Sequence, residues 1–216
     1  SAAYAARKVG SSVVKIATKQ EALVYDFFFM PVVQEREGLG SGVIIDKSGY
    51  ILTNNHVVEG VTEITVVLVD GRQLPGSIVG TDPYTDLAVI KVEGSDLPAA
   101  ELGNSDNLVI GEPAIAIGNP YGFDHTVTAG VISAINRSVT IDASTGNALE
   151  GLIQTDAPIN PGNSGGALVT STGTVIGINT AIVAQAQGIG LAIPINSART
   201  VANEIIQYGK VRRPYV

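Results

Sequence analysis

The chain has 216 residues, of which 45% are hydrophobic and 15% are charged, and this composition predicts a globular protein with a sizeable core. Its net charge of −7 argues against a nucleic-acid partner, because nucleic acids are bound by basic surfaces. The sequence has no apolar run of about 18 residues to cross a membrane as a helix, and no cysteine for disulfides, thiolate chemistry or zinc binding.

Short apolar segments bounded by turn residues follow one another along the chain, which predicts an all-β protein. The first set is GSGVIID, YILTNNHVV, EITVVLV, SIVGTD and LAVIKV. After a loop over residues 93–107 comes a second set: PAIAIG, VTAGVISAI, LIQTD, GALVT, TVIGINTAI and IGLAIP. A spacing of roughly 8–12 residues favours barrels or a sandwich over alternating strands and helices. Because the loop divides the strands about equally, we expect two packed barrels, over residues of about 8–100 and 108–195.

One long helix is predicted near the end of the chain, in NSARTVANEIIQYG over residues 196–209. Ser197 is a candidate N-cap, and Gly209 can end the helix. Val201, Ile205 and Tyr208 fall near one face, which we expect to pack against the barrels.

Residues 27–29, Phe-Phe-Phe, stand in the Pro-bounded segment QEALVYDFFFMPVVQEREG between two strands. Core packing is one interpretation of them. The other, which we favour, is an exposed aromatic patch that contacts another subunit or a partner.

The motifs of several ligand-binding classes are missing. The segment GLGSG at residues 38–42 does not match GxGxxG and opens a strand, and there is no P-loop, so we expect no nucleotide cofactor. With two histidines and no HExxH motif, the sequence also predicts no metal site.

The stretch NPGNSGGALV places Ser164 among small residues directly before a strand. GNSGG fits GxSxG, but a nucleophile elbow needs a helix after the serine and a catalytic histidine later in the chain. Here both histidines, His56 and His125, precede Ser164. A triad must therefore run His, Asp, Ser, which is the order in the chymotrypsin-like double barrel.

The two barrels also decide between the histidines. In a two-barrel enzyme the base and the nucleophile come from opposite barrels, so we choose His56, at the end of the strand YILTNNHVV, over the loop residue His125. Among the acids, Asp86 stands at the mouth of the apolar strand LAVIKV without a packing reason. Asp70 and Asp82 have adequate roles as turn formers.

Five segments together resemble the protease domain of the HtrA/DegP serine protease family: GSGVIIDKSGYILTNNHVV, DPYTDLAVIKV, IAIGNPYGFDHTVTAGVIS, LIQTDAPINPGNSGGALV and GIGLAIP. The likeness runs from about residue 5 to 216. It implies a chymotrypsin-like fold of two six-stranded antiparallel β-barrels with a C-terminal helix. It also implies that His56, Asp86 and Ser164 form the catalytic triad, without a cofactor.

The resemblance further implies a quality-control endopeptidase for unfolded proteins, usually a homotrimer, on the extracytoplasmic side of the cell (the periplasm or cell envelope). In that family one or two PDZ domains follow the protease domain, and a membrane anchor is an option in the full-length protein. The sequence stops at VRRPYV, where the linker into a PDZ domain normally begins, so we expect no PDZ domain in this chain. Either the full-length protein continues into a PDZ domain, or this member of the family lacks one.

By the same resemblance the oxyanion hole is formed by the amides of Gly162 and Ser164, with the Asn163 peptide setting the curvature of the loop. Pro161 limits the freedom of this loop, yet we expect that the hole can change between formed and collapsed states.

The primary specificity pocket is expected just before Ser164 and after the sequence GIN, at Ile159, Thr180, Ala181, Ile182, Ile189 and Leu191. None of these is an acid that could hold Lys or Arg. We therefore predict cleavage after small or medium aliphatic residues.

Arg137 precedes a segment rich in Ser, Thr, Gly and Asn, which we expect to be a mobile loop. The plain interpretation is a solvated arginine at a strand end. The resemblance instead implies a regulatory residue that couples the loop to the oxyanion hole through carbonyls of the 158–162 turn. A different class of function, a module that holds unfolded chains without cutting them, is also compatible with apolar pockets.

Overall fold

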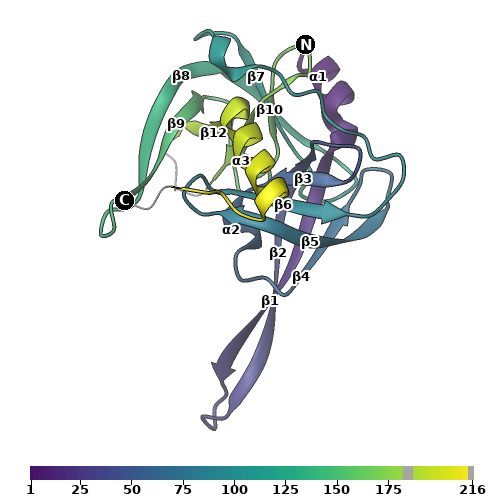
Figure 1. The fold of residues 1–216 in the computed structure, drawn as a ribbon, viewed down its shortest axis with the longest axis vertical. Coiled ribbons are helices and arrows are strands. Elements are labelled where there is room, and N and C mark those ends of the chain that lie inside the picture. Colours follow the sequence, from purple (N-terminus) through teal and green to yellow (C-terminus); the bar gives the residue numbers. More distant parts are fainter. Residues whose placement is uncertain (182–186, 214–216) are drawn as a thin grey trace.

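The computed structural model describes residues 1–181 and 187–213, which form two closed β-barrels and a C-terminal helix (Figure 1). The first barrel has the strand order β1-β2-β3-β6-β5-β4 and the second has β10-β11-β12-β9-β8-β7, with antiparallel pairing throughout both. The all-β double-barrel fold with a C-terminal helix is therefore confirmed.

The strands of the first barrel are β1 (Val13–Tyr25), β2 (Pro31–Ile44), β3 (Tyr50–Thr53), β4 (Glu63–Val67), β5 (Gln73–Asp82) and β6 (Leu87–Val92). Those of the second are β7 (Pro113–Gly118), β8 (Thr126–Asp142), β9 (Asn147–Thr155), β10 (Ala167–Val169), β11 (Val175–Thr180) and β12 (Gly190–Pro194). The helical segments are α1 (Ala2–Val9), η1 (Gly10–Ser12), α2 (Asn55–Val58), η2 (Ser105–Asn107) and α3 (Ile195–Tyr208).

Each barrel encloses an apolar core, and a third cluster joins the barrels. Val14, Ile16 and Ile90 are fully buried within the first barrel, and Leu168 is fully buried within the second. The largest cluster takes residues from both barrels and from α3: Val43, Leu52, Leu87, Ile117, Leu152, Ile178 and Ile205 are among them. Burial of this shared apolar surface holds the two barrels together.

Helix α3 packs across both barrels, contacting β5 and β6 of the first and β11 and β12 of the second. It ends as predicted at Gly209, which has a φ of 74° and donates its amide to Ile205 O. The predicted N-cap is wrong, because the helix begins at Ile195 and Ser197 lies inside it. Ser105 provides the local hydrogen bonding, since its Oγ accepts from the Asn196 amide at 3.0 Å.

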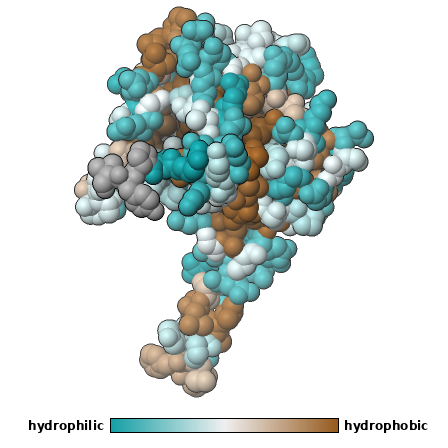
Figure 2. All heavy atoms as spheres, viewed as in Figure 1, coloured by the Kyte–Doolittle hydropathy of each residue, from teal (hydrophilic) through white to brown (hydrophobic). Residues whose placement is uncertain are grey.

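The segment expected to lie between two strands is itself mostly strand, because β1 and β2 continue through it as a hairpin that projects beyond the barrel (Figure 1). At its tip Asp26 Oδ1 accepts the amides of Phe28 and Met30, both at 2.9 Å. Phe27 is 91% exposed, and the tip forms a hydrophobic end of the molecule in Figure 2. The core-packing interpretation of the three phenylalanines is thus wrong.

Two other expectations need correction. YILTNNHVV is not one strand: β3 ends at Thr53, and His56 lies in α2, the single helical turn that follows. The segment after Arg137 is largely not a loop either, because β8 and β9 form a hairpin with a turn at residues 143–146. β-Branched residues such as Val139, Thr140 and Ile141 favour the strand there.

Candidate active site

His56 and Asp86 are brought together within the first barrel. Asp86 is the last residue of the turn between β5 and β6, and its Oδ2 lies 2.7 Å from His56 Nδ1. The His56 backbone amide donates to Asp86 Oδ1 at 3.0 Å. A carboxylate oxygen can only accept, so Nδ1 carries the proton of the neutral imidazole and Nε2 is left as an acceptor toward Ser164.

Asp86 is fully buried and has a left-handed φ of 56°, an uncommon conformation for a residue other than glycine. Besides His56, Thr180 Oγ1 donates to Asp86 Oδ2 at 2.8 Å. Thr180 lies on β11 of the second barrel, so the acid receives hydrogen bonds from both barrels. Three donors thus satisfy a carboxylate that is inaccessible to water.

Ser164 comes from the second barrel, three residues before the start of β10, and its Oγ lies 3.1 Å from His56 Nε2. The Ala181 amide also donates to this Oγ at 3.1 Å. The following Gly165 has a φ of 83°, and a Cβ there would collide with the Ser41 carbonyl. The strand after the serine can therefore approach the first barrel closely only because residue 165 is glycine.

The loop before Ser164 is a tight turn around the Asn160 carbonyl. This oxygen accepts the amides of Asn163 at 3.0 Å and Ser164 at 3.1 Å. Asn163 fixes the turn further, because its Oδ1 accepts the Asn160 amide and its Nδ2 donates to Pro158 O. From the first barrel, Ser41 Oγ donates to Gly162 O at 2.9 Å. In this conformation the Ser164 amide is thus engaged within the loop.

A cavity of about 250 Å³ lies beside this loop, between residues 156–160 and 187–190. Ile159 and Ile189 line it, together with the acid Asp156, which the sequence interpretation did not include. Asp156 Oδ1 accepts the Val131 amide at 2.8 Å, so this oxygen is held by the backbone.

The other residues predicted for the pocket lie elsewhere or are not described. Thr180 is directed to Asp86, and the Ala181 amide to Ser164. Leu191 is 2% exposed and belongs to the core cluster that joins the barrels. Ile182 lies outside the described residues.

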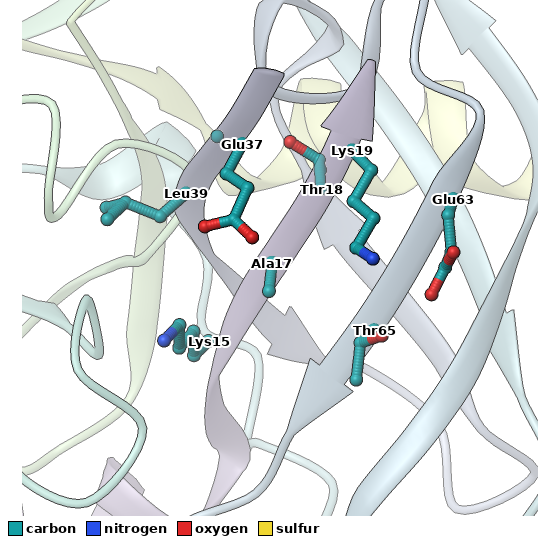
Figure 3. A pocket seen from close by; sticks show the side chains of 9 residues that line it. Lys15, Ala17, Thr18, Lys19, Glu37, Leu39, Glu63 and Thr65 are labelled. Atoms are coloured by element: carbon teal, nitrogen blue, oxygen red, sulfur yellow. The ribbon is translucent and has the colours of Figure 1, made fainter. Parts of the chain in front are cut away.

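Further cavities lie on the first barrel, and two of them are lined by residues of β1 and β2. One of about 220 Å³ adjoins His56 and Pro161, and Leu39, Val57 and Glu59 line it as well. The larger, of about 410 Å³, lies against β1, β2 and β4 (Figure 3). There Lys19 stands opposite Glu37 on one neighbouring strand and Glu63 on the other.

The remaining candidates, His125, Arg137 and Asp70, make their contacts with residues other than Ser164. His125 Nε2 lies 3.4 Å from Val13 O, and its ring packs on Gly10. Arg137 is exposed on β8 opposite Leu152. Within the described residues no hydrogen bond joins it to the 158–162 turn, contrary to the expected contact. Asp70 accepts from Arg72 in its turn.

Asp82, the other acid set aside in the sequence, is 2% exposed and forms a bidentate ion pair with Arg213, both distances being 2.7 Å. Burial opposes ionisation of Asp82, but hydrogen bonds from Arg213 and Thr85 outweigh it and hold the pKa of the carboxyl below its usual value.

Residues 1–181 and 187–213 contain neither a cluster of metal ligands nor a membrane-spanning helix. No group of three or more His, Cys, Asp and Glu side chains could hold a metal ion there. No helix in the same ranges is long and apolar enough to cross a membrane.

Comparison with known proteins adds the family. Residues 40–178 match the family model described as a trypsin-like peptidase domain. HhoA of Synechocystis is 48% identical over 99% of this chain and 59% of its own length, and the periplasmic pH-dependent serine endoprotease DegQ of Escherichia coli is 47% identical over 83% and 40%. The solved structure "HtrA-type protease AlgWS227A with decapeptide" has a TM-score of 0.89 and 43% identity, covering 100% of this chain and 69% of that chain.

The chain spans about half the length of the curated relatives it matches. The match to the family model covers well over half of the chain, and relatives close to half identical extend the likeness to nearly all of it. The chain therefore belongs to the trypsin-like peptidase family and, within it, to the HtrA-type serine proteases.

Proposed function

We propose that this protein is a serine endopeptidase in which Ser164 is the nucleophile, His56 the general base and Asp86 the acid that orients the imidazole. One observation carries the proposal: a continuous path of hydrogen-bonding distances runs from Asp86 Oδ2 through His56 to Ser164 Oγ, with steps of 2.7 and 3.1 Å. Such a path supplies a nucleophile, its base and the group that fixes the base's tautomer.

In the proposed reaction Ser164 Oγ attacks the carbonyl carbon of the scissile peptide while His56 Nε2 takes the hydroxyl proton. His56 then gives this proton to the leaving amine, and an ester of Ser164 remains. A water molecule, deprotonated by the same imidazole, hydrolyses the ester and returns the serine.

The amides of Gly162 and Ser164 are the proposed donors to the oxyanion. Because the Ser164 amide is bonded to Asn160 O in this structure, formation of the hole requires that bond to break. A single donor of this kind is worth about 3–4 kcal/mol in the transition state, so the position of this loop can control the rate.

For the substrate we propose unfolded polypeptide cut after small or medium aliphatic residues. Ile159 and Ile189 on the cavity beside the loop support this preference, and a backbone amide occupies one oxygen of the single acid there, Asp156. The solved structure of an HtrA-type protease with a decapeptide supports a peptide ligand.

For the biological setting we propose protein quality control outside the cytoplasm by a homotrimer. The support is the family, in which several relatives carry periplasmic names, among them DegQ of Escherichia coli.

Digestion of casein by wild type and by Ser164→Ala tests the proposal. The variant should lose several orders of magnitude in turnover, because nucleophile and base act as a unit. Mass spectrometry of the wild-type fragments should show mainly Val, Ala, Ile or Leu before the cut. Undiminished cleavage by the variant would refute the nucleophile, and cuts mainly after Lys or Arg would refute the pocket.

A second candidate function is the holding of unfolded chains, favoured by the exposed apolar hairpin tip. Ser164→Ala would then still suppress aggregation of a reduced, unfolding substrate such as lysozyme. Ser164→Ala combined with Phe27→Ser and Phe28→Ser should lose that suppression, and an equal effect of both proteins would exclude the tip as the holding surface.

A further inference from the structure

Asn54 lies buried between two residues of the proposed triad. Its Nδ2 donates to the Asp86 backbone carbonyl at 3.1 Å, and its Oδ1 accepts from Ser164 Oγ at 2.7 Å. The side chain is fully inaccessible to solvent. Asp86 and Ser164 are thus connected twice, once through the imidazole of His56 and once through this amide.

The Asn54 side chain does not cap the helix that it precedes. Asn54 is the N-cap residue of α2, where an asparagine ordinarily accepts a backbone amide of the first helical turn. It makes no capping hydrogen bond here. The amide is instead turned toward the catalytic residues, which shows that its contacts there dominate over the local one.

The orientation of the amide follows from its neighbours. The Asp86 carbonyl can only accept, so the nitrogen of Asn54 must face it and the oxygen must face Ser164. An oxygen in that place can only accept from the Ser164 hydroxyl.

The hydroxyl has one proton and two acceptors within reach. Asn54 Oδ1 lies 2.7 Å away and His56 Nε2 lies 3.1 Å away. The Ala181 amide occupies a lone pair of the same oxygen, at 3.1 Å. A distance of 2.7 Å is that of a well-formed O–H···O bond, so in this conformation the proton points at Asn54.

We propose that Asn54 is a positioning residue that holds the Ser164 hydroxyl in a resting orientation, and that catalysis requires this hydrogen bond to pass to His56. The proposal rests on the proposed serine-protease function. In the resting orientation the Ser164 hydroxyl proton points away from His56 Nε2, the atom that must abstract it, although all three residues of the triad are in place. The same amide also supports the backbone of Asp86, whose φ is left-handed.

The ¹⁵N resonance of His56 Nε2 at pH 8 tests the proposal without measuring activity, because an imidazole nitrogen that accepts a hydrogen bond resonates upfield of one that does not. In Ser164→Ala the resonance should stay at its wild-type position, since the hydroxyl was bonded to Asn54. In Asn54→Ala the resonance should move upfield, because His56 Nε2 is then the remaining one of the two acceptors for the Ser164 hydroxyl. In the double variant it should return, since the shift depends on the hydroxyl.

Asn55→Ala is the matched control, since it removes the neighbouring asparagine, the first residue of α2, and should leave the resonance unmoved. A downfield move in Ser164→Ala would show that His56 already holds the proton in the wild type, and the proposal would be wrong even if Asn54→Ala did not fold. An upfield shift that persists in the double variant would also overturn it. The failure of the protease function itself would be seen separately, as casein cleavage by Ser164→Ala.

Discussion

Asp86 shows how much one residue depends on its neighbours. Its two carboxylate oxygens accept from the His56 amide, the His56 ring and the Thr180 hydroxyl. The sequence allowed its choice, because an acid at the mouth of the strand LAVIKV has no packing role. It did not reveal Thr180 as its partner. That contact joins residues 94 positions apart and exists only after the barrels dock.

Replacing Thr180 with Val should lower kcat/KM roughly tenfold, since a hydrogen bond to a charged group is worth about 1.5–3 kcal/mol. The preference for aliphatic residues before the cut should not change, because Thr180 does not line the cavity beside the loop before Ser164. Peptide turnover and the melting temperature of Thr180→Val and Thr180→Ser are to be compared. Thr180→Ser keeps the hydroxyl and should stay near wild type, whereas a loss in Thr180→Ser with wild-type turnover in Thr180→Val would mean that shape, and not the hydroxyl, matters at this position.

Replacing His56 and replacing His125 should have different effects on peptide turnover. His56→Ala should abolish peptide turnover, whereas His125→Ala should keep it within about twofold, because the His125 ring packs against the N-terminal segment at Gly10. Initial rates at pH 8 suffice. The reverse outcome would move the general base to the second barrel and refute the proposed triad.

Among the elements, the strands with strong apolar character were predictable, and two short or extended features were not. The helix α2 has four residues, too few to show a 3.6-residue period, so its sequence continued the pattern of β3. The segment around the three phenylalanines was expected between two strands, but pairing of β1 with β2, which extends to Tyr25, carries the strands through most of it. Pro31 is tolerated because it is the first residue of β2.

The β8–β9 hairpin carries the prediction about Arg137. We propose that this exposed residue acts when the hairpin moves toward the 158–162 turn, so Arg137→Ala should lower kcat severalfold. The melting temperature should be unchanged, since exposed substitutions alter stability by about 0.5 kcal/mol or less. Arg137→Lys, which keeps the charge but not the planar donor fork, should recover little. Wild-type turnover in Arg137→Ala would leave it a surface charge.

At the scale of the molecule, the division into two strand sets was readable from the loop at residues 93–107, whereas the packing of the barrels was not. The joining cluster draws single residues from many segments, such as Val43, Ile117 and Ile205, which have no common pattern in the sequence. The distribution of the proposed catalytic residues over both barrels was inferred from the chain order of His, Asp and Ser and from the expected two-barrel fold.

The segment after α3 is fastened to the first barrel by Arg213, which pairs with Asp82 and lies 4.7 Å from the Tyr84 ring. Arg213→Ala should lower the free energy of unfolding by about 1–3 kcal/mol, because it leaves a buried carboxylate without its cation. Arg212→Ala, which removes the neighbouring arginine stacked on Tyr208, is the control.

The effect of Arg213→Ala should depend on pH. Because the pKa of Asp82 is lowered in the folded protein, the ion pair contributes fully above the ordinary pKa of an aspartate, near 4, and is lost as the pH falls through the lowered value. Urea unfolding at pH 7, 4 and 3 should therefore show a difference from wild type that shrinks toward acid. A constant difference would assign the effect to packing on Tyr84.

The placement of the proposed base and nucleophile on different barrels has a consequence for biosynthesis. A chain emerging from the ribosome can complete its first barrel while Ser164 and Thr180 are still unmade, and that intermediate holds a base and an acid with nothing to activate. Reactivity arises only when the last third of the chain has folded onto the first part. The nascent chain would thus gain proteolytic activity only after its second barrel has folded.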